Sequence, residues 1–369
     1  MHRKAWISKA CWQTPQMLEQ TGMNILITGG AGFIGSHLVR AALSCGHSVL
    51  NYDALTYAAN PLTLADINTS AYRLIRADVT DAEKLTETLT AFRPDAVIHV
   101  AAETHVDRSI DAPAPFIHTN VAGTLCVLEA TLAYWKQAGA PAHFRLIHVS
   151  TDEVYGPLAD SAPPVREGAA YNPSSPYAAS KAASDHLARA WARTWGLPVI
   201  VTQCGNNFGS CQYPEKLIPH MILRALAGET LPIYGAGDQI RDWIHAADHA
   251  DALLHVLGMD PDQTVLIGAQ APMRNIDVVT AICAHLDALA PRTTGPYADL
   301  IRHVEDRPGH DRRYALDPAR LYATGWRPRH EFGPALRDTV AWYINNPAWV
   351  EEAREKGYHS ARIGQRAGG

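Results

Sequence analysis

Two short stretches hold the side chains best suited to proton transfer. In the first, SSPYAASK, Tyr177 and Lys181 are four residues apart, so on a helix they lie one turn apart on the same face. A nearby ammonium favours the phenolate and lowers a tyrosine pKa from its usual value of about 10. Such a base can take a proton from a hydroxyl group. The same spacing also suits an incidental pair on a surface helix, so it needs support from other features.

The second stretch ends in a pair of carboxyl groups. The apolar run Phe144–Val149 is typical of a buried parallel strand, and it leads through Ser150 and Thr151 to Asp152 and Glu153. Polar residues at the carboxyl end of a strand lie where open α/β sheets bind ligands. Adjacent carboxyls can divide the roles of acid and base if their surroundings separate the two pKa values. The alternative is a solvated strand-to-loop junction.

A glycine-rich turn upstream predicts a nucleotide site in the same sheet. A short apolar strand, Asn24–Thr28, is followed by a turn with glycines at Gly29, Gly32 and Gly35, and then by a helical pattern through about Cys45. Glycines allow a tight turn and let the backbone approach a pyrophosphate at a helix N-terminus. The spacing is GxxGxxG rather than GxGxxG.

A carboxylate at the end of the next strand predicts which dinucleotide binds. The strand Ser48–Tyr52 ends at Asp53, 18 residues after Gly35. There a carboxylate accepts the ribose hydroxyls of NAD and repels a 2′-phosphate. No Arg or Lys occurs in residues 54–56, so we expect NAD rather than NADP.

Strands and helices alternate from residue 24 to 150, which predicts a doubly wound, Rossmann-type parallel sheet of the α/β class. A capping-box pattern from Thr80 to Glu83 predicts the start of one of the helices. Asp78, just before it, suits either an adenine contact or a simple loop acid. The remaining expected strands are Tyr72–Ala77, Asp95–Ala101 and Val199–Gln203, and the longest expected helix runs from Phe116 to about Lys136.

After Gln203 the elements become shorter and turns more frequent, which predicts a smaller, mixed α/β C-terminal domain for the substrate. Cys204–Pro219 and Ile233–Trp243 have the composition of loop-rich segments. Lys216, Arg241 and Arg307 could clamp a phosphorylated ligand, because guanidinium forks match phosphate oxygens.

A pair of histidines, His245 and His249, has the i, i+4 spacing of metal ligands. The chain lacks the HExxH glutamate beside them and an obvious third ligand. We therefore expect a structural pair and no metal.

Composition narrows the class of protein. Of 369 residues, 47% are hydrophobic and 19% charged, and the net charge is −5. These values argue against a general nucleic-acid or membrane-surface binder. Six cysteines without CxxC spacing favour reduced thiols in the cytoplasm. No stretch is expected to be a secretory signal or to reach transmembrane length.

The predicted domain organisation has four parts. Residues 1–22 are expected to form a disordered extension, and residues 23–203 an NAD-binding domain. Residues 204–350 are expected to form mainly the substrate-binding domain, with some elements returning to the first. Residues 351–369 are expected to form a flexible tail.

From Met23 to about Trp349 the chain resembles the extended short-chain dehydrogenase/reductases, and more narrowly the dTDP-glucose 4,6-dehydratases. The motifs that carry the resemblance are TGGAGFIGSH, YDALTYAAN, AAETHVDRSI, STDEVYG, PYAASKAASD, NNFG…YPEKLIP, IYGAGDQIRDWIHAADHA and EDRPGHDRRYALD. The chain departs from the family's NNYGP at Phe208 and Ser210, with Cys211 following, which bears on the fit of the substrate loop.

The resemblance implies a set of site residues. It implies NAD contacts, besides the glycine turn, by Phe33, Ile34, Asp53, Thr56, Asp78, Val79, Ala101, Ala102, Thr119, Tyr177, Lys181 and Asn207. It implies sugar-nucleotide contacts by Thr104, Thr151, Asn206, Lys216, Leu217, Pro232, Tyr234, Arg241, Asn275 and Arg307 through His310.

The resemblance also implies conversion of dTDP-glucose to dTDP-4-keto-6-deoxyglucose and water. Tyr177, assisted by Lys181 and Thr151, would deprotonate the C4 hydroxyl as hydride passes to NAD. Glu153 would then remove the C5 proton while a protonated Asp152 donates to the departing C6 hydroxyl, and hydride would return to C6. A homodimer joined through a four-helix bundle, built from the helices around Phe116–Lys136 and Tyr177–Trp195 of each subunit, is implied as well.

Four other functions share parts of these motifs. A sugar-nucleotide 4-epimerase or a UDP-glucuronate decarboxylase would share the glycine turn, Asp53, Tyr177 and Lys181, but an epimerase has no use for the acid–base pair. A GDP-mannose 4,6-dehydratase is expected to have Ser in place of Asp152. A non-catalytic NAD-binding sensor is disfavoured because all four candidate catalytic side chains are present.

Overall fold

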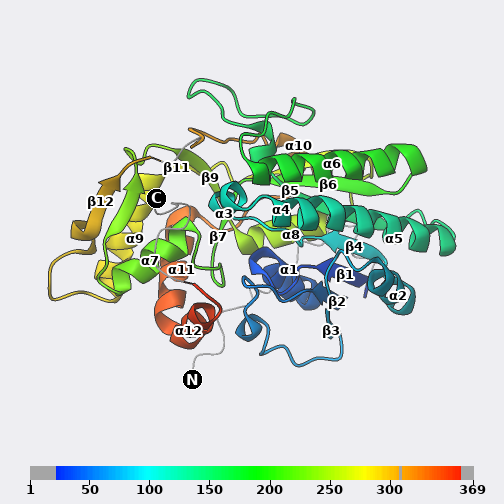
Figure 1. Ribbon diagram of the computed structural model, residues 1–369, viewed down its shortest axis with the longest axis horizontal. Helices are drawn as coiled ribbons and strands as arrows, with labels where there is room; N and C mark the ends of the chain where they lie inside the picture. Colours follow the sequence, from blue (N-terminus) through cyan, green and yellow to red (C-terminus); the bar gives the residue numbers. More distant parts are fainter. Residues whose placement is uncertain (1–21, 307–309, 359–369) are drawn as a thin grey trace.

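The computed structural model describes residues 22–306 and 310–358 and is built on a parallel sheet of seven strands (Figure 1). The strand order is β10-β6-β5-β4-β1-β2-β3, and every neighbouring pair is parallel. The order reverses at β1, where such sheets bind ligands. The strands are β1 (Asn24–Thr28), β2 (Ser48–Asp53), β3 (Tyr72–Arg76), β4 (Ala96–His99), β5 (Arg145–Thr151), β6 (Val199–Cys204) and β10 (Gln263–Ile267).

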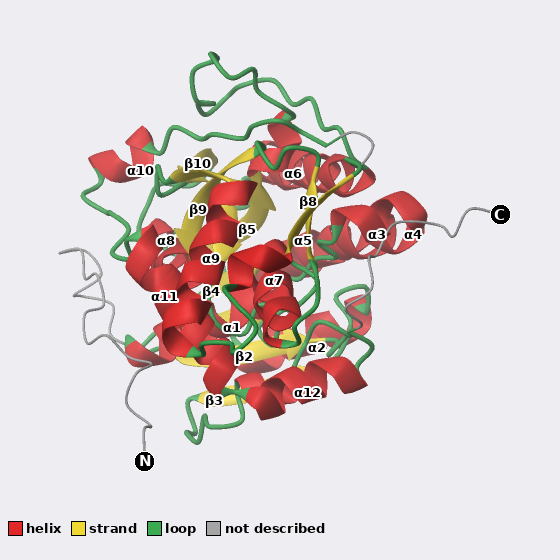
Figure 2. Ribbon diagram, turned by 90° about the vertical axis from the view of Figure 1, so that its left-hand side faces the viewer, coloured by secondary structure: helices red, strands yellow, loops and turns green. Residues whose placement is uncertain are grey.

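Helices cover both faces of this sheet, so its central strands are buried and can be almost wholly apolar. In Figure 2 the sheet lies between α8 and α10 on one side and α5 and α6 on the other. One hydrophobic core packs α1 and α8 against the strands, and a second packs α2, α5 and α6. The helices are α1 (Phe33–Ser44), α2 (Ala82–Phe92), α3 (Val106–Asp111), α4 (Ala114–Phe116), α5 (Thr124–Gln137), α6 (Pro176–Trp195), α8 (Ala246–Val256) and α10 (Ala319–Ala323), with 3-10 turns at Pro61–Thr63 and Asp152–Tyr155.

A smaller unit with its own hydrophobic core follows β6 in the chain. It contains a three-stranded sheet of order β11-β9-β7 and the parallel pair β12-β8. β10 and α10 follow in sequence but pack with the large sheet. The elements of the smaller unit are β7 (Asn206–Phe208), α7 (Leu217–Leu226), β8 (Leu231–Tyr234), β9 (Ile240–His245), β11 (Pro272–Arg274), α9 (Asn275–Leu289), β12 (Ile301–Val304), α11 (Phe332–Asn345) and α12 (Pro347–Glu355), with a 3-10 turn at Tyr297–Leu300.

The two segments expected to be loop-rich contain more regular structure than predicted. Cys204–Pro219 includes β7 and the start of α7, and Ile233–Trp243 includes the end of β8 and most of β9. β9 pairs with β7 and β11, and β8 pairs with β12, so the partners are distant in the sequence. Strands of only three to six residues are too short to show a clear hydrophobic periodicity, so the sequence did not predict them.

The expected flexible tail also begins with packed structure. α12 continues to Glu355, and Val350, Ala353 and Tyr358 are buried. Residues 359–369, like residues 1–21 of the expected extension, lie outside the described residues.

The long helix expected at Phe116–Lys136 runs from Ala114 to Gln137 and contains a π-helical segment at Ile117–Gly123. Contrary to the expectation from sequence, it has the length and hydropathy of a membrane span. Its most apolar window is nevertheless 44% buried within the molecule. Its inner face packs in the core beside α2 and α6, so it serves as a core helix of the described fold.

The capping box places the start of α2 one residue too early. The N-cap is Asp81, whose side chain accepts from the backbone N–H of Lys84 at 2.9 Å. Thr80 instead donates to Asp78 through its N–H and its hydroxyl, at 2.9 and 2.8 Å.

Candidate active site

The glycine turn, the ends of β2 and β4, and the start of α2 enclose a cavity of about 190 Å³, which we call the cofactor cavity. Twelve of the predicted NAD-binding residues line it: Gly29, Gly32, Phe33, Ile34, Gly35, Asp53, Thr56, Asp78, Val79, Ala101, Ala102 and Thr119. The predicted substrate contact Thr104 lines this cavity as well.

The glycines are required by close approach of the backbone. Gly29 has φ +72°, and a Cβ there would lie 2.7 Å from the Cα of Ala101. A Cβ on Gly35 would lie 2.0 Å from the carbonyl oxygen of Gly29. The turn therefore keeps backbone atoms at the cavity wall, as pyrophosphate binding at the start of α1 demands.

Asp53 fastens this turn to the end of β2. Its carboxylate accepts the N–H of Ala31 at 2.8 Å and of Leu55 at 2.7 Å, one on each oxygen. Burial raises the pKa of Asp53, while the two N–H groups lower it. The remaining lone pairs fit the ribose hydroxyls of a dinucleotide, so the residues suit NAD.

The position of Asp78 is compatible with both interpretations that the sequence left open. It lines the cofactor cavity, and its Oδ1 also accepts both donors of Thr80 in the turn before α2.

The carboxyl pair lies where β5 passes into a 3-10 turn with Thr151 as its N-cap. The Thr151 hydroxyl donates to Oδ1 of Asp152 at 3.2 Å and accepts the N–H of Glu153 at 3.3 Å. Glu153 reaches the wall of the neighbouring cavity, whereas Asp152 is only 4% exposed. The two carboxyls thus have different surroundings, as separate acid and base roles require.

Asp152 is held in its protonated form near neutral pH. Burial, and next the charge of Glu153, raise its pKa to about 8, although Arg241 opposes the shift. Oδ2 of Asp152 has no hydrogen-bond partner among the described residues. A protonated carboxyl with a spare oxygen can act as a general acid.

Tyr177 and Lys181 lie one turn apart in α6, which begins at Pro176 with Ser175 as its N-cap. Both side chains are buried, at 7% and 3% exposure. Nζ of Lys181 donates to the carbonyl oxygen of Val149 at 2.9 Å.

From the sequence we expected Lys181 to lower the pKa of Tyr177. In the structure this pKa is raised instead. Burial, and then the charge of Glu153, raise the pKa of Tyr177 well above its ordinary value, with only a partial offset from its hydrogen bond to Thr151. The expectation was wrong, because the cost of burying a phenolate dominates the pKa of Tyr177.

A larger cavity of about 530 Å³, the substrate cavity, opens between the sheet edge and the smaller unit. Arg241 is 6% exposed at its wall, where its guanidinium lies over the Tyr314 ring at 4.5 Å and donates to the carbonyl of Asp311 at 2.8 Å. Lys216 lines both cavities and donates to the carbonyl of Thr104 at 2.7 Å. Predicted substrate residues that line the substrate cavity are Asn206, Lys216, Leu217, Pro232, Tyr234, Arg241, Asn275 and His310.

Some predicted site residues lie elsewhere. Arg307, with the next two residues of its run, is outside the described residues. Asn207 does not line either cavity; its side chain contacts Nδ1 of His249 at 2.9 Å and donates to the carbonyl of Gly205 at 3.0 Å. The departure from the family pattern at Phe208 is buried, at 1% exposure, against aromatic rings.

The histidine pair does not converge. Nδ1 of His245 caps α8 by accepting the N–H of Ala247 at 3.3 Å, and its ring stacks on His330 at 4.3 Å. Within residues 22–306 and 310–358, no three His, Cys, Asp or Glu side chains form a metal-binding group.

Sequence reasoning missed several residues at the cavity walls. Glu215 lines both cavities. Its carboxylate accepts a hydrogen bond from the Tyr57 hydroxyl at 3.2 Å and forms an ion pair with Nε of Arg108 at 3.1 Å. Tyr314 lies beside Arg241 in the substrate cavity. Glu215 immediately precedes Lys216 in the YPEKLIP motif, so that motif could have identified it.

Comparison with known proteins agrees with this geometry. The family model described as GDP-mannose 4,6 dehydratase matches residues 26–339. The chain is 49% identical to a probable dTDP-glucose 4,6-dehydratase of Sinorhizobium fredii, over 93% of this chain and 99% of that one. It is 49% identical to dTDP-glucose 4,6-dehydratase 1 of Escherichia coli K12, over 92% and 97%.

A solved structure extends the likeness to the fold. The dTDP-glucose 4,6-dehydratase DesIV of Streptomyces venezuelae, solved with NAD and TYD bound, superimposes with a TM-score of 0.80 at 40% identity. The match covers 89% of this chain and 98% of that one. The chain therefore belongs to the GDP-mannose 4,6-dehydratase family and, within it, to the dTDP-glucose 4,6-dehydratases.

Proposed function

We propose that this protein is an NAD-dependent hydro-lyase that converts dTDP-glucose to dTDP-4-keto-6-deoxyglucose and water. One observation favours this reaction over those of other enzymes with the same fold. The buried, protonated Asp152 lies beside Glu153, which faces the substrate cavity. An acid next to a base is what elimination of water requires, and a 4-epimerase has no use for it.

We assign roles by position. Tyr177 takes the proton of the C4 hydroxyl, and Thr151 and Lys181 support it. Glu153 removes the C5 proton, and Asp152 donates to the departing C6 oxygen. NAD, when bound, accepts hydride from C4 and returns it to C6.

The proposed binding roles follow the two cavities. The glycine turn, Asp53 and the other residues of the cofactor cavity hold NAD. Lys216 and Arg241, with their charges at the wall of the substrate cavity, bind the diphosphate of the sugar nucleotide.

The test is incubation of the purified protein with dTDP-glucose and, separately, with UDP-glucose. We expect a product of the dTDP sugar that is lighter by one water and absorbs after alkali treatment. Glu153→Gln should abolish it, and Asp152→Asn should slow it. An isomer of unchanged mass would mean an epimerase, and NAD binding without turnover would mean a sensor.

We also propose a cytoplasmic homodimer joined through the helices around Phe116–Lys136 and Tyr177–Trp195. In support, Ile117 and Trp195 remain 51% and 42% exposed on these helices. Four of the five described cysteines, Cys126, Cys204, Cys211 and Cys283, carry free thiols, which suits a reducing compartment, whereas Cys45 is disulfide-bonded. Light scattering should give about twice the chain mass of 40.2 kDa, and Ile117→Asp should give the monomer mass.

A further inference from the structure

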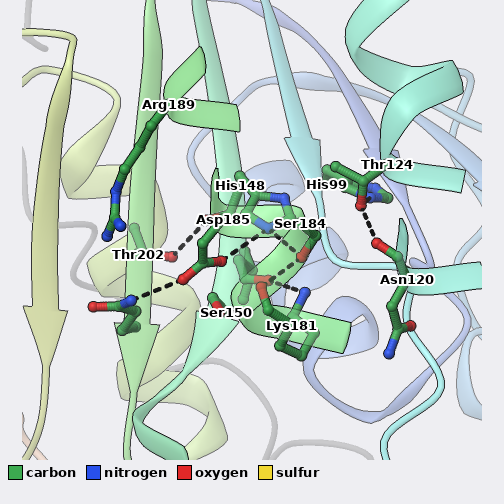
Figure 3. A network of polar contacts seen from close by, with 12 residues as sticks. His99, Asn120, Thr124, His148, Ser150, Lys181, Ser184, Asp185, Arg189 and Thr202 are labelled. Atoms are coloured by element: carbon green, nitrogen blue, oxygen red, sulfur yellow. Dashed lines mark hydrogen bonds and ion pairs between the residues drawn. The ribbon is translucent and has the colours of Figure 1, made fainter. Parts of the chain in front are cut away.

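A network of buried polar side chains lies around Lys181 and Asp185 of α6 (Figure 3). Its starting point is the ammonium of Lys181, which is 3% exposed and donates to the carbonyl of Val149. A buried ammonium is expensive unless a negative charge compensates it. Burial accordingly lowers the pKa of Lys181, and Asp185 is the first group that opposes this shift.

Asp185 follows Lys181 by one turn of α6 and is fully buried, at 0% exposure. Its Oδ2 accepts from the Tyr171 hydroxyl at 2.7 Å and from Nε2 of Gln203 at 2.8 Å. Its Oδ1 lies 3.2 Å from Nε2 of His148. Two donors, from β6 and from the loop before α6, and a contact with His148 of β5 therefore converge on one carboxylate.

These donors keep Asp185 ionised. Burial alone would raise its pKa, but the contact with His148, the charge of Lys181 and the hydrogen bond from Tyr171 bring the pKa below its ordinary value. Burial lowers the pKa of His148, so the imidazole is neutral near pH 7 and its contact with Asp185 adds no charge.

The other titratable groups that face Lys181 are neutral. From β4, His99 has a pKa lowered by burial, and its ring lies 5.5 Å from that of His148 on β5. From β6, the Cys204 thiol has a pKa raised by burial to about 12. Among these groups, Asp185 is the one that carries negative charge.

One further cation reaches the network from the outside. Arg189, on the next turn of α6, donates to the Tyr171 hydroxyl at 2.5 Å and to Oγ1 of Thr264 at 3.1 Å. These hydrogen bonds connect Arg189 to Asp185 only through the Tyr171 hydroxyl. The negative charge of Asp185 can therefore compensate the positive charge of Lys181.

We infer that Asp185 is a positioning residue for the reaction, whose carboxylate keeps Lys181 in the ammonium form and anchors its helix turn to β5 and β6. The charge of Lys181 matters because a neutral amine would not favour the phenolate of Tyr177. The link to catalysis rests on the proposed function, whereas the control of charge on Lys181 does not.

The direct test is an NMR titration of the lysine side chains in protein labelled with ¹³C- and ¹⁵N-lysine. The chain has seven lysines, and the resonance of Lys181 is the one missing from Lys181→Arg. We expect Asp185→Asn to lower the pKa of Lys181 by about one unit or more, at least a roughly tenfold change in its acid dissociation constant. Ser184→Ala is the matched control, because it removes a buried hydroxyl 3.1 Å from Nε2 of His148 without changing a charge.

An equal fall in the pKa of Lys181 in Asp185→Asn and Ser184→Ala would overturn the inference, since packing would then be the cause. If Asp185→Asn does not fold, the wild-type titration decides: Lys181 must be charged at pH 7, and a neutral amine there would refute the role of Asp185. Neither measurement uses turnover, so this test of the charge on Lys181 remains valid even if the substrate is another sugar nucleotide.

A second readout ties the charge to the reaction. In the Asp152→Asn background, where the limb set by Asp152 is absent, Asp185→Asn should move the remaining alkaline limb of kcat/KM against pH to lower pH by the shift seen in the titration. A uniform loss of activity at every pH, with the limb unmoved, would leave Asp185 a structural residue only and contradict the inference.

Discussion

The cofactor cavity and the substrate cavity lie side by side and share Glu215 and Lys216, yet they are built differently. The cofactor cavity is lined largely by glycine, alanine and other small or apolar residues near the turns that follow β1, β2 and β4. The substrate cavity is lined by charged and aromatic side chains that span residues 105–358. Close contacts between backbone segments shape the cofactor cavity, whereas side chains from many elements shape the substrate cavity.

This difference predicts different responses to mutation. A site shaped by backbone fails when a single methyl group is added, because no rotamer can relieve the clash. A site shaped by side chains loses affinity in steps, because each charged group contributes separately.

The largest effect is expected from Gly35→Ala. The new Cβ would lie 2.0 Å from the carbonyl oxygen of Gly29 and 2.7 Å from the Cα of Gly30. The turn must open, so the purified variant should contain no bound NAD and show no turnover. NAD content can be read after denaturation, with Gly333→Ala as control, since its Cβ would meet nothing within 4 Å. Retention of NAD by Gly35→Ala would show that the turn is not rigid.

A smaller effect is expected from Arg241→Gln in the substrate cavity. Loss of a charged hydrogen-bond donor typically costs about 1.5–3 kcal/mol, so affinity for dTDP-glucose should fall roughly 10- to 100-fold while NAD content stays unchanged. Calorimetry of dTDP binding measures this. Arg274→Gln, which removes an exposed pair with Asp277, should bind normally. Equal losses in both variants would argue against a specific phosphate contact.

Asp53→Asn should weaken the preference for NAD over NADP by about tenfold, because the charge that repels a 2′-phosphate is lost. Asp78→Asn is the comparison within the same cavity: its carboxylate is exposed and mainly caps a turn, so NAD affinity should change little. Fluorescence titration of the two dinucleotides separates these cases. A larger effect at Asp78 would favour the adenine contact.

The smallest expected effects concern pH and Asp152. The general acid must be protonated, so activity should fall as pH rises through the Asp152 pKa of about 8, and this limb should vanish in the slower Asp152→Asn. A carboxyl whose pKa is higher in the folded state stabilises the fold below the unfolded value, and this contribution is lost as pH rises from about 4 to about 8.

Thermal unfolding tests the stability half of that prediction. Asp152→Asn should raise the midpoint temperature of unfolding by roughly 2–4 °C at pH 8.5 and should not raise it at pH 4. A gain of equal size at both values would mean that the carboxyl is not the titrating group.

Much of the large sheet could be predicted from sequence because six of its seven strands, all except β10, are locally recognisable. β1 was predicted with its observed bounds, and the expected strands ending at Asp53, Ala77 and Gln203 differ from β2, β3 and β6 by one residue at most. Apolar runs that end in polar residues signal a parallel sheet wherever they occur. The short strands of the smaller unit carry no such signal, because their partners lie far away in the chain.

The sequence by itself determined the glycine turn, Asp53, the carboxyl pair and the Tyr177–Lys181 spacing, since each is a contiguous pattern with one local conformation. Only the tertiary structure decided which charges these groups carry. Burial raises the pKa of Asp152 and Tyr177 and makes Lys181 dependent on Asp185, and burial depends on every element packed around a side chain. Desolvation is a property of the assembled fold, and no local pattern encodes it.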